Sequence, residues 1–171
     1  MVPYQLRYNV AYEILLAALE KTASVLPALI LRRVYTQARL EKQVIIDTRT
    51  ANPIEFSLGS SVPRVHAWFT LANLSNFAWR VRDFSAEIWL GQPIATVTCK
   101  DKPTISRKRM GSIFAESFLS EIQVRRVNEF KSRRAEGNVG IIAVYVNAQL
   151  ESRLGLVQFK LALENRPISI C

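Results

Sequence analysis

The chain has 171 residues, of which 23 are Lys or Arg and 14 are Asp or Glu, so its formal net charge is +9. This length fits one folded domain with an extension, and 49% hydrophobic with only 22% charged residues excludes a disordered composition. A single His and two distant cysteines, Cys99 and Cys171, cannot form a Cys/His zinc site, and we expect both thiols to be reduced. No basic stretch precedes a short apolar stretch and a cleavage site at the N-terminus, which predicts a cytoplasmic protein without a cleavable signal peptide.

The first predicted element is an amphipathic helix from Asn9 to about Leu40, with Asn9 as its N-cap. Pro27 should bend this helix near Val25, because proline removes a backbone donor and clashes with the preceding turn. Apolar residues recur on one face at spacings of three and four, and the candidate docking residues among them are Tyr12, Leu15, Leu16, Leu19, Leu26 and Ile30. This face predicts a helix that packs on the domain, on a protein partner or on a membrane surface.

The segment 14–31 is nearly apolar enough to span a bilayer, since 13 of its 18 residues are apolar. Glu20 and Lys21 would then lie near the centre, at a cost of about 2.5 to 3.5 kcal/mol each. We therefore expect an amphipathic helix rather than a span. If the segment did span, the basic residues that follow it would place the rest of the chain on the cytoplasmic side.

The pattern changes after Lys42 from a helical period to a period of two, which divides the chain into a helical segment 1–42 and a β domain 43–171. Residues 64–71 alternate as a half-buried strand, and a turn follows at 73–76. Trp79 to Leu90 forms the next predicted strand. Its apolar phase switches from odd to even positions, which predicts a β-bulge near Asp83.

Gly91-Gln92 is typical of a tight turn, so the strand Ile94 to Cys99 should form a hairpin with the strand before it. Another strand is predicted from Arg107 to Phe118.

A helix follows with Ser120 as its N-cap, its apolar positions at Leu119, Ile122, Val127 and Phe130, and its stop at Gly137-Asn138. Two strands, Val139 to Leu150 and Leu154 to Leu163, then close the chain as a hairpin. About seven strands with a single inserted helix favour an antiparallel β-sandwich.

Three stretches of this pattern resemble the group-2 late embryogenesis abundant domain, also called the water stress and hypersensitive response (WHy) domain. They are the strand with its Asn turn at 69–77, the hairpin at 86–95 and the helix at 118–130. The chain departs from the family at Leu74, where a Pro is common, and at Ala78-Trp79, where a Pro-Ile pair is common. The resemblance, which covers about Pro53 to Ile168, implies an immunoglobulin- or fibronectin type III-like sandwich with no catalytic residues and no cofactor. It also implies a role in desiccation and stress protection, often beside a membrane-anchoring segment, and in some relatives a link to lipid handling.

Candidates for catalysis are few. His66 is the only imidazole and no orienting carboxylate and nucleophile are evident beside it, so we expect a surface or sheet-packing residue. Asp83 and Glu87 share one strand face, which is ordinary for a β domain. The six glycines form no phosphate loop. The sequence therefore predicts a protein that is not an enzyme, with no metal and no cofactor.

Positive charge is concentrated in residues 100–134, which contain ten basic and four acidic residues. Such a segment attracts phosphate on anionic lipid or on nucleic acid, although a solvated basic face would have the same composition. Trp68 and Trp79 could stack on bases, but core positions are the more common use of tryptophan in a sandwich. The candidate anion or lipid contacts are Arg107, Lys108, Arg109, Arg125, Arg126, Lys131, Arg133 and Arg134.

We therefore expect a non-enzymatic binding or protective module that associates with a membrane surface or an anionic partner through its N-terminal helix and basic residues. One alternative is a structural subunit of a larger complex, docked by the same helix. The other is a basic nucleic-acid-binding protein. No small-molecule substrate is inferred.

Overall fold

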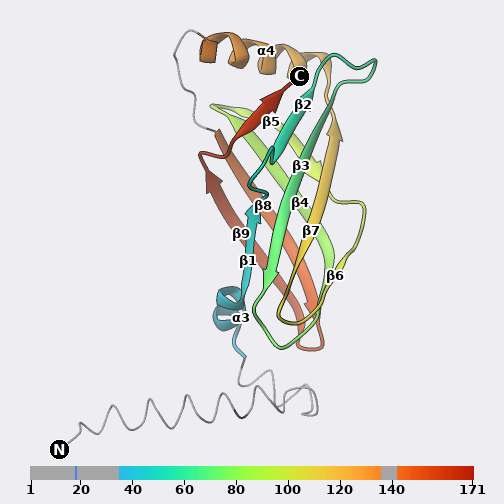
Figure 1. Ribbon diagram of the computed structural model, residues 1–171, viewed down its shortest axis with the longest axis vertical. Helices are drawn as coiled ribbons and strands as arrows, with labels where there is room; N and C mark the ends of the chain where they lie inside the picture. Colours follow the sequence, from blue (N-terminus) through green and yellow to red (C-terminus); the bar gives the residue numbers. More distant parts are fainter. Residues whose placement is uncertain (1–17, 19–34, 136–141) are drawn as a thin grey trace, which may run out of the picture.

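The computed structural model describes residue 18 and residues 35–135 and 142–171 (Figure 1). The docking residues of the predicted helix and its bend at Pro27 lie outside the described residues, as does the predicted stop at Gly137-Asn138. Where the predicted helix reaches the described residues, Ala18 is helical, Thr36 is extended, and the helix that follows runs from Gln37 to Gln43 rather than ending near Leu40. Within the described part of the chain, no helix is long and apolar enough to cross a membrane.

The described residues are mainly β, as predicted, and one helix lies between the seventh and eighth strands. The elements in chain order are α3 (Gln37–Gln43), β1 (Val44–Thr48), β2 (Ile54–Ser57), β3 (Arg64–Asn73), β4 (Trp79–Leu90), β5 (Pro93–Thr98), β6 (Thr104–Ile105), β7 (Arg109–Phe118), α4 (Glu121–Ala135), β8 (Ile142–Ser152), β9 (Gly155–Glu164) and β10 (Ile168–Ile170).

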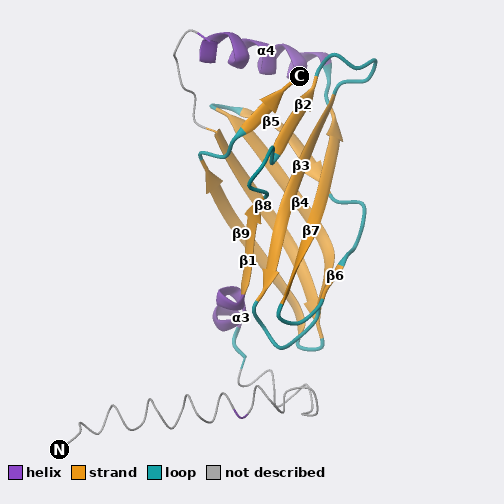
Figure 2. Ribbon diagram, in the orientation of Figure 1, coloured by secondary structure: helices purple, strands orange, loops and turns teal. Residues whose placement is uncertain are grey.

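These strands form one mixed sheet in the order β10-β2-β3-β7-β5-β4-β8-β9, with β1 also paired to β3 and β6 to β4. Among the described strands only β10 and β2 run parallel, so the sheet is mixed where a purely antiparallel arrangement is predicted. The sheet curls on itself. β5 and β7 are joined at the single pair Thr98 and Glu116, and the rings of Phe69 on β3 and Phe84 on β4 lie 4.8 Å apart, so the two parts of the sheet face each other. Figure 2 shows α4 across one end of the strands and α3 near the other end.

The core lies inside this curl. On β3 the side chains of Val65, Ala67, Phe69 and Leu71 are buried and their neighbours are not, as the alternation predicts. Tyr35 and Leu40 also belong to the core, with the ring of Tyr35 edge-on to Phe77 at 5.0 Å between centroids. The folded unit therefore includes residues on the N-terminal side of position 43.

A buried polar network fixes the turn after β3. Asn73 Nδ2 donates to the carbonyl oxygens of Phe77 at 2.7 Å and Ser106 at 2.9 Å, and Ser75 N donates to Asn73 Oδ1 at 3.0 Å. Trp79 Nε1 donates to Ser75 Oγ at 2.8 Å. The predicted Asn turn thus ties three segments together, because buried polar groups are stable only when they are hydrogen-bonded.

The predicted irregularities of the sheet are confirmed. The register of β4 against β8 shifts between Val81 and Asp83, at the predicted bulge. Gly91 has φ 73°, a left-handed conformation that glycine adopts without strain, and it turns β4 into β5. β8 and β9 form the predicted closing hairpin.

The structure corrects several predicted boundaries. β5 ends at Thr98, one residue before Cys99, and β7 begins at Arg109 rather than Arg107. The described part of the chain has ten strands where about seven are predicted. The short strands β2, β6 and β10 account for the difference, since four, two and three residues are too few to show a period of two.

Candidate functional site

The basic residues predicted to contact anions fall into two groups at opposite ends of the sheet. Arg107, Lys108 and Arg109 precede or begin β7, whereas the others lie on α4, after β7 ends. The ten residues of β7 span about 30 Å, since a strand rises about 3.3 Å per residue. The structure therefore does not bring the two groups together (Figure 1).

The fixed position of α4 comes from its first turn and its inner face. Ser120 N donates to Gln123 Oε1 at 2.8 Å and Gln123 N donates to Ser120 Oγ at 3.4 Å, which is the capping arrangement expected of the predicted N-cap. Gln123 Nε2 also donates to the carbonyl of Ile94 at 2.7 Å. Because Val127 and Phe130 are buried, the opposite face of the helix is turned to solvent.

The solvent face of α4 is basic. The helix carries five basic residues, all exposed except the half-buried Arg126, and two acidic ones, Glu121 and Glu129, a net charge of +3 (five minus two). Only Arg125 is paired within the helix, with its Nε 3.6 Å from Glu129 Oε1. The basic residues are Arg125, Arg126, Lys131, Arg133 and Arg134.

Exposed apolar side chains lie beside this basic face. Phe118 at the end of β7 is 59% exposed and Ile122 in the first turn of α4 is 65% exposed. Exposed Val62 is held nearby, because Leu119 N donates to the carbonyl of Pro63 at 2.9 Å. We call Val62, Phe118, Ile122 and the five basic residues of α4 the α4 end.

The middle residue of the second basic group, Lys108, is hydrogen-bonded to the turn after β3. Lys108 has φ 53°, its N donates to the carbonyl of Ser75 at 3.2 Å, and its Nζ donates to the carbonyl of Leu74 at 2.6 Å. Arg107 and Arg109 are exposed on either side of it. We call Arg107, Lys108 and Arg109 the β6–β7 end. Lys108 stabilises the buried turn of Asn73, and the guanidinium groups of Arg107 and Arg109 lie in solvent.

The single histidine has a carboxylate partner that the sequence analysis missed. His66 and Glu116 are register partners on β3 and β7, with Nε2 and Oε2 3.8 Å apart. A hydrogen bond of 2.8 Å from Lys100 Nζ holds the pKa of Glu116 below its ordinary value. His66 also contacts the rings of Trp68 and Phe114, which contact each other, with centroid distances of 5.4 to 5.9 Å within the cluster. Among the described residues no Ser, Thr or Cys side chain is hydrogen-bonded to His66.

The other candidates for chemistry occupy structural positions. Trp79 is fully buried, which confirms the core interpretation, and Trp68 is half-buried with the guanidinium of Arg49 4.5 Å from its ring centre. Both cysteines are free, and burial raises the pKa of Cys99, whose Sγ donates to the carbonyl of Asp101 at 2.8 Å. Within the described ranges no three His, Cys, Asp or Glu side chains cluster to hold a metal ion.

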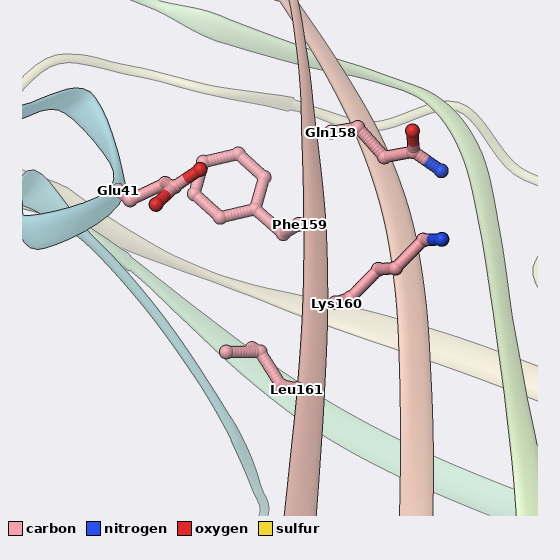
Figure 3. A pocket seen from close by; sticks show the side chains of 5 residues that line it. All are labelled: Glu41, Gln158, Phe159, Lys160 and Leu161. Atoms are coloured by element: carbon pink, nitrogen blue, oxygen red, sulfur yellow. The ribbon is translucent and has the colours of Figure 1, made fainter. Parts of the chain in front are cut away.

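A cavity of about 380 Å³ lies beside β9 and is lined by Glu41, Gln158, Phe159, Lys160 and Leu161. β9 is an end strand of the sheet path, paired only with β8 among the described residues. Figure 3 shows Phe159 and Leu161 projecting toward the side of Glu41, whereas Gln158 and Lys160 project away from it. The cavity therefore follows the strand edge, and its polar groups do not converge on one point.

Comparison with known proteins gives no family: no protein-family model matches the chain, and no curated protein matches it. Solved structures resemble it at low identity. A Northeast Structural Genomics Consortium target is 14% identical with a TM-score of 0.47, over 76% of this chain and 89% of that one. A protein from Archaeoglobus fulgidus is 12% identical with a TM-score of 0.40, over 73% and 95%. A protein from Arabidopsis thaliana is 12% identical with a TM-score of 0.40, over 74% and 79%.

Proposed function

We propose that this protein is a non-enzymatic binding module that docks on an anionic membrane surface through the α4 end. The observation that carries the proposal is the placement of exposed Phe118 and Ile122 beside the net +3 helix at one end of the molecule. Anionic headgroups attract such a helix, and the apolar side chains enter the boundary between headgroups and acyl chains.

The magnitudes favour a reversible contact. Each Lys or Arg near an anionic surface contributes about 1 kcal/mol, and a fully buried apolar side chain about 1.5 to 3 kcal/mol. Loss of translational freedom opposes these terms, so the α4 end gives weak, salt-sensitive binding. A second contact would strengthen it, and we assign that contact to the predicted N-terminal helix with Tyr12, Leu15, Leu16, Leu19, Leu26 and Ile30.

We further propose that the curled sheet is the fibronectin type III-like sandwich of the group-2 late embryogenesis abundant domains, with a protective role at the cytoplasmic face of a membrane. Three features support this. The turn after β3 is built on a buried Asn, β4 and β5 form the expected hairpin, and α4 precedes the two closing strands. Inward-facing rings of Phe69 and Phe84 from the two halves of the sheet meet in the core, as in a two-layer arrangement.

The test is co-sedimentation of the full chain with vesicles of phosphatidylcholine alone and of phosphatidylcholine mixed with phosphatidylserine, at low and high salt. We expect sedimentation with the mixed vesicles that falls as salt rises and little with the neutral ones. No sedimentation with anionic vesicles, together with elution as a large species, would favour the structural-subunit alternative. A salt-sensitive gel shift of a DNA duplex in the absence of vesicle binding would favour the nucleic-acid alternative.

A further inference from the structure

The outer face of β4, β5, β8 and β9 carries two adjacent rows of side chains that the register aligns across the strands. One row is Thr96, Glu87, Tyr145 and Ala162, and the next is Thr98, Ser85, Asn147 and Lys160. Residues two apart on a strand share a face, so both rows point outward, away from the core.

The sizes of these side chains leave a hollow. Ser85, Thr96 and Ala162 are short, whereas Tyr145 and Lys160 are long, and a cavity of about 470 Å³ lies over them. This volume is in the range of small-molecule sites, about 300 to 1,000 Å³. The cavity is separate from the α4 end, because it lies on a sheet face rather than at the end of the strands.

One wall of the hollow is aromatic and preorganised. Tyr145 is 44% exposed, and its ring meets that of Trp89 edge-on, with centroids 5.4 Å apart and planes at 70°. Trp89 is on the same face as Glu87, two residues along β4. An edge-to-face contact of this kind restricts the orientation of the exposed ring, which then presents a fixed apolar plate to the cavity.

The polar groups around the ring of Tyr145 include one acidic and one basic side chain, and both donors and acceptors of hydrogen bonds. The carboxylate of Glu87 and the ammonium of Lys160 have no ion-pair partner within the described ranges, and their positions are two strands and one row apart, about 12 Å along the backbone lattice. Asn147 Oδ1 accepts from Gln158 Nε2 at 3.1 Å, so the amide group of Asn147 keeps its donors for a ligand. Hydroxyls of Ser85 and Thr96 can both donate and accept.

We propose that this cavity binds a neutral, polyhydroxylated ligand, a saccharide. A sugar ring has an apolar C–H face that fits the ring of Tyr145, and a rim of hydroxyls that both donate and accept. Its donors meet Glu87 and its acceptors meet Lys160 and Asn147. The carboxylate of Glu87 would repel a phosphate, and the ammonium of Lys160 would repel a simple cation. The charges that line the cavity therefore disfavour both ligands.

The test is a titration of the full chain with maltotriose and with cellotriose, followed by amide chemical shifts. We expect saturable shifts confined to residues 85–87, 96, 145–147 and 160–162 with at least one of the two probes. Tyr145→Ala should weaken the binding by about tenfold or more, since it removes the plate, and Tyr145→Phe should retain it. Phe114→Ala is the matched control, because Phe114 is a 38% exposed ring on β7, outside this face.

Three results would overturn the proposal. They are the absence of shifts with both trisaccharides at millimolar excess, equal binding by the wild-type protein and the folded Tyr145→Ala variant, and shifts with glycylglycine but with neither sugar. The last result would assign the Glu87 and Lys160 pair to a zwitterion. Far-ultraviolet circular dichroism of each variant verifies the fold, which we expect to be unchanged because both substituted side chains point away from the core.

Discussion

Ser75 Oγ donates a 2.6 Å hydrogen bond to Asn73 Oδ1, and each of these two polar residues is only 1% exposed. The pair sits where β3 ends and where the segments before β4 and β7 converge. Its bonds reach the main chain at Phe77 and Ser106 and the indole of Trp79. The turn is therefore a buried structural element, and not only a change of chain direction.

Asn73→Ala should destabilise the protein strongly. The substitution removes the donor to the carbonyls of Phe77 and Ser106 and the acceptor of Ser75 N, and each buried polar group that is left unsatisfied costs about 1 to 3 kcal/mol. Chemical denaturation should show a lower midpoint at an unchanged slope. Asn128→Ala is the control, because Asn128 is exposed on α4 and should change the free energy of unfolding by less than about 0.5 kcal/mol. Equal stability of the two variants would show that the buried network contributes nothing.

A side chain at Gly111 on β7 should force the side chain of Ile105 to move. A Cβ at this position would overlap Cδ1 of Ile105, a core side chain that is 4% exposed. Because overpacking a core costs about 1 to 3 kcal/mol, Gly111→Ala should lower the thermal midpoint measurably. Gly59→Ala is the matched control, since no atom lies within 4 Å of a Cβ built there. A Gly111→Ala midpoint equal to that of Gly59→Ala would mean that Ile105 moves without cost.

The protein should lose stability in acid partly through two glutamates. Hydrogen bonds from Lys100 and Arg82 hold the pKa values of Glu116 and Glu151 below their ordinary values. A lowered pKa in the folded state stabilises above the unfolded value of about 4.3, and the contribution is lost as the pH falls through the folded value.

Thermal unfolding between about pH 5 and pH 3 tests this expectation. The double variant Glu116→Gln, Glu151→Gln should show a shallower fall of the midpoint with acid than the wild type. Glu164→Gln should fall as the wild type does, because Glu164 is exposed and forms no ion pair with any described residue. A double variant as acid-sensitive as the wild type would show that solvent fully screens both ion pairs.

The apolar part of the α4 end should matter for vesicle binding. Ile122→Ser removes a 65% exposed side chain that we propose enters the membrane, and losing up to about 1.5 to 3 kcal/mol should weaken partitioning about tenfold or more. Leu156→Ser is the control, because Leu156 is 59% exposed at the start of β9, away from α4. Binding of the two variants is compared by sedimentation with vesicles that contain phosphatidylserine. A loss of equal size in both variants would exclude a specific role for Ile122.

Local patterns in the sequence predicted the elements that repeat over many residues. The alternation from Val65 to Leu71 gives β3 its buried face, and the phase switch at Asp83 marks the bulge, because both signals are contained in one strand. Strands of two to four residues have no such signal, and β2, β6 and β10 are fixed by pairing with other strands instead.

Features that depend on register or distance could not be predicted in this way. Glu116 meets His66 only because β7 aligns with β3, and the hollow beside Tyr145 requires four aligned strands. For the basic residues, closeness in sequence was misleading. Arg109 and Arg125 are close in sequence, but the extended strand between them carries them to opposite ends of the molecule.

The most direct test of the proposed function is a comparison of two matched charge variants in vesicle sedimentation. Arg133→Gln, Arg134→Gln removes two charges from the α4 end, and Arg107→Gln, Arg109→Gln removes two from the β6–β7 end. We predict that the first variant loses about 2 kcal/mol, a roughly thirtyfold weaker association with vesicles containing phosphatidylserine, while the second binds as the wild type does. Equal losses in both variants, or a loss only in the second, would contradict docking through the α4 end.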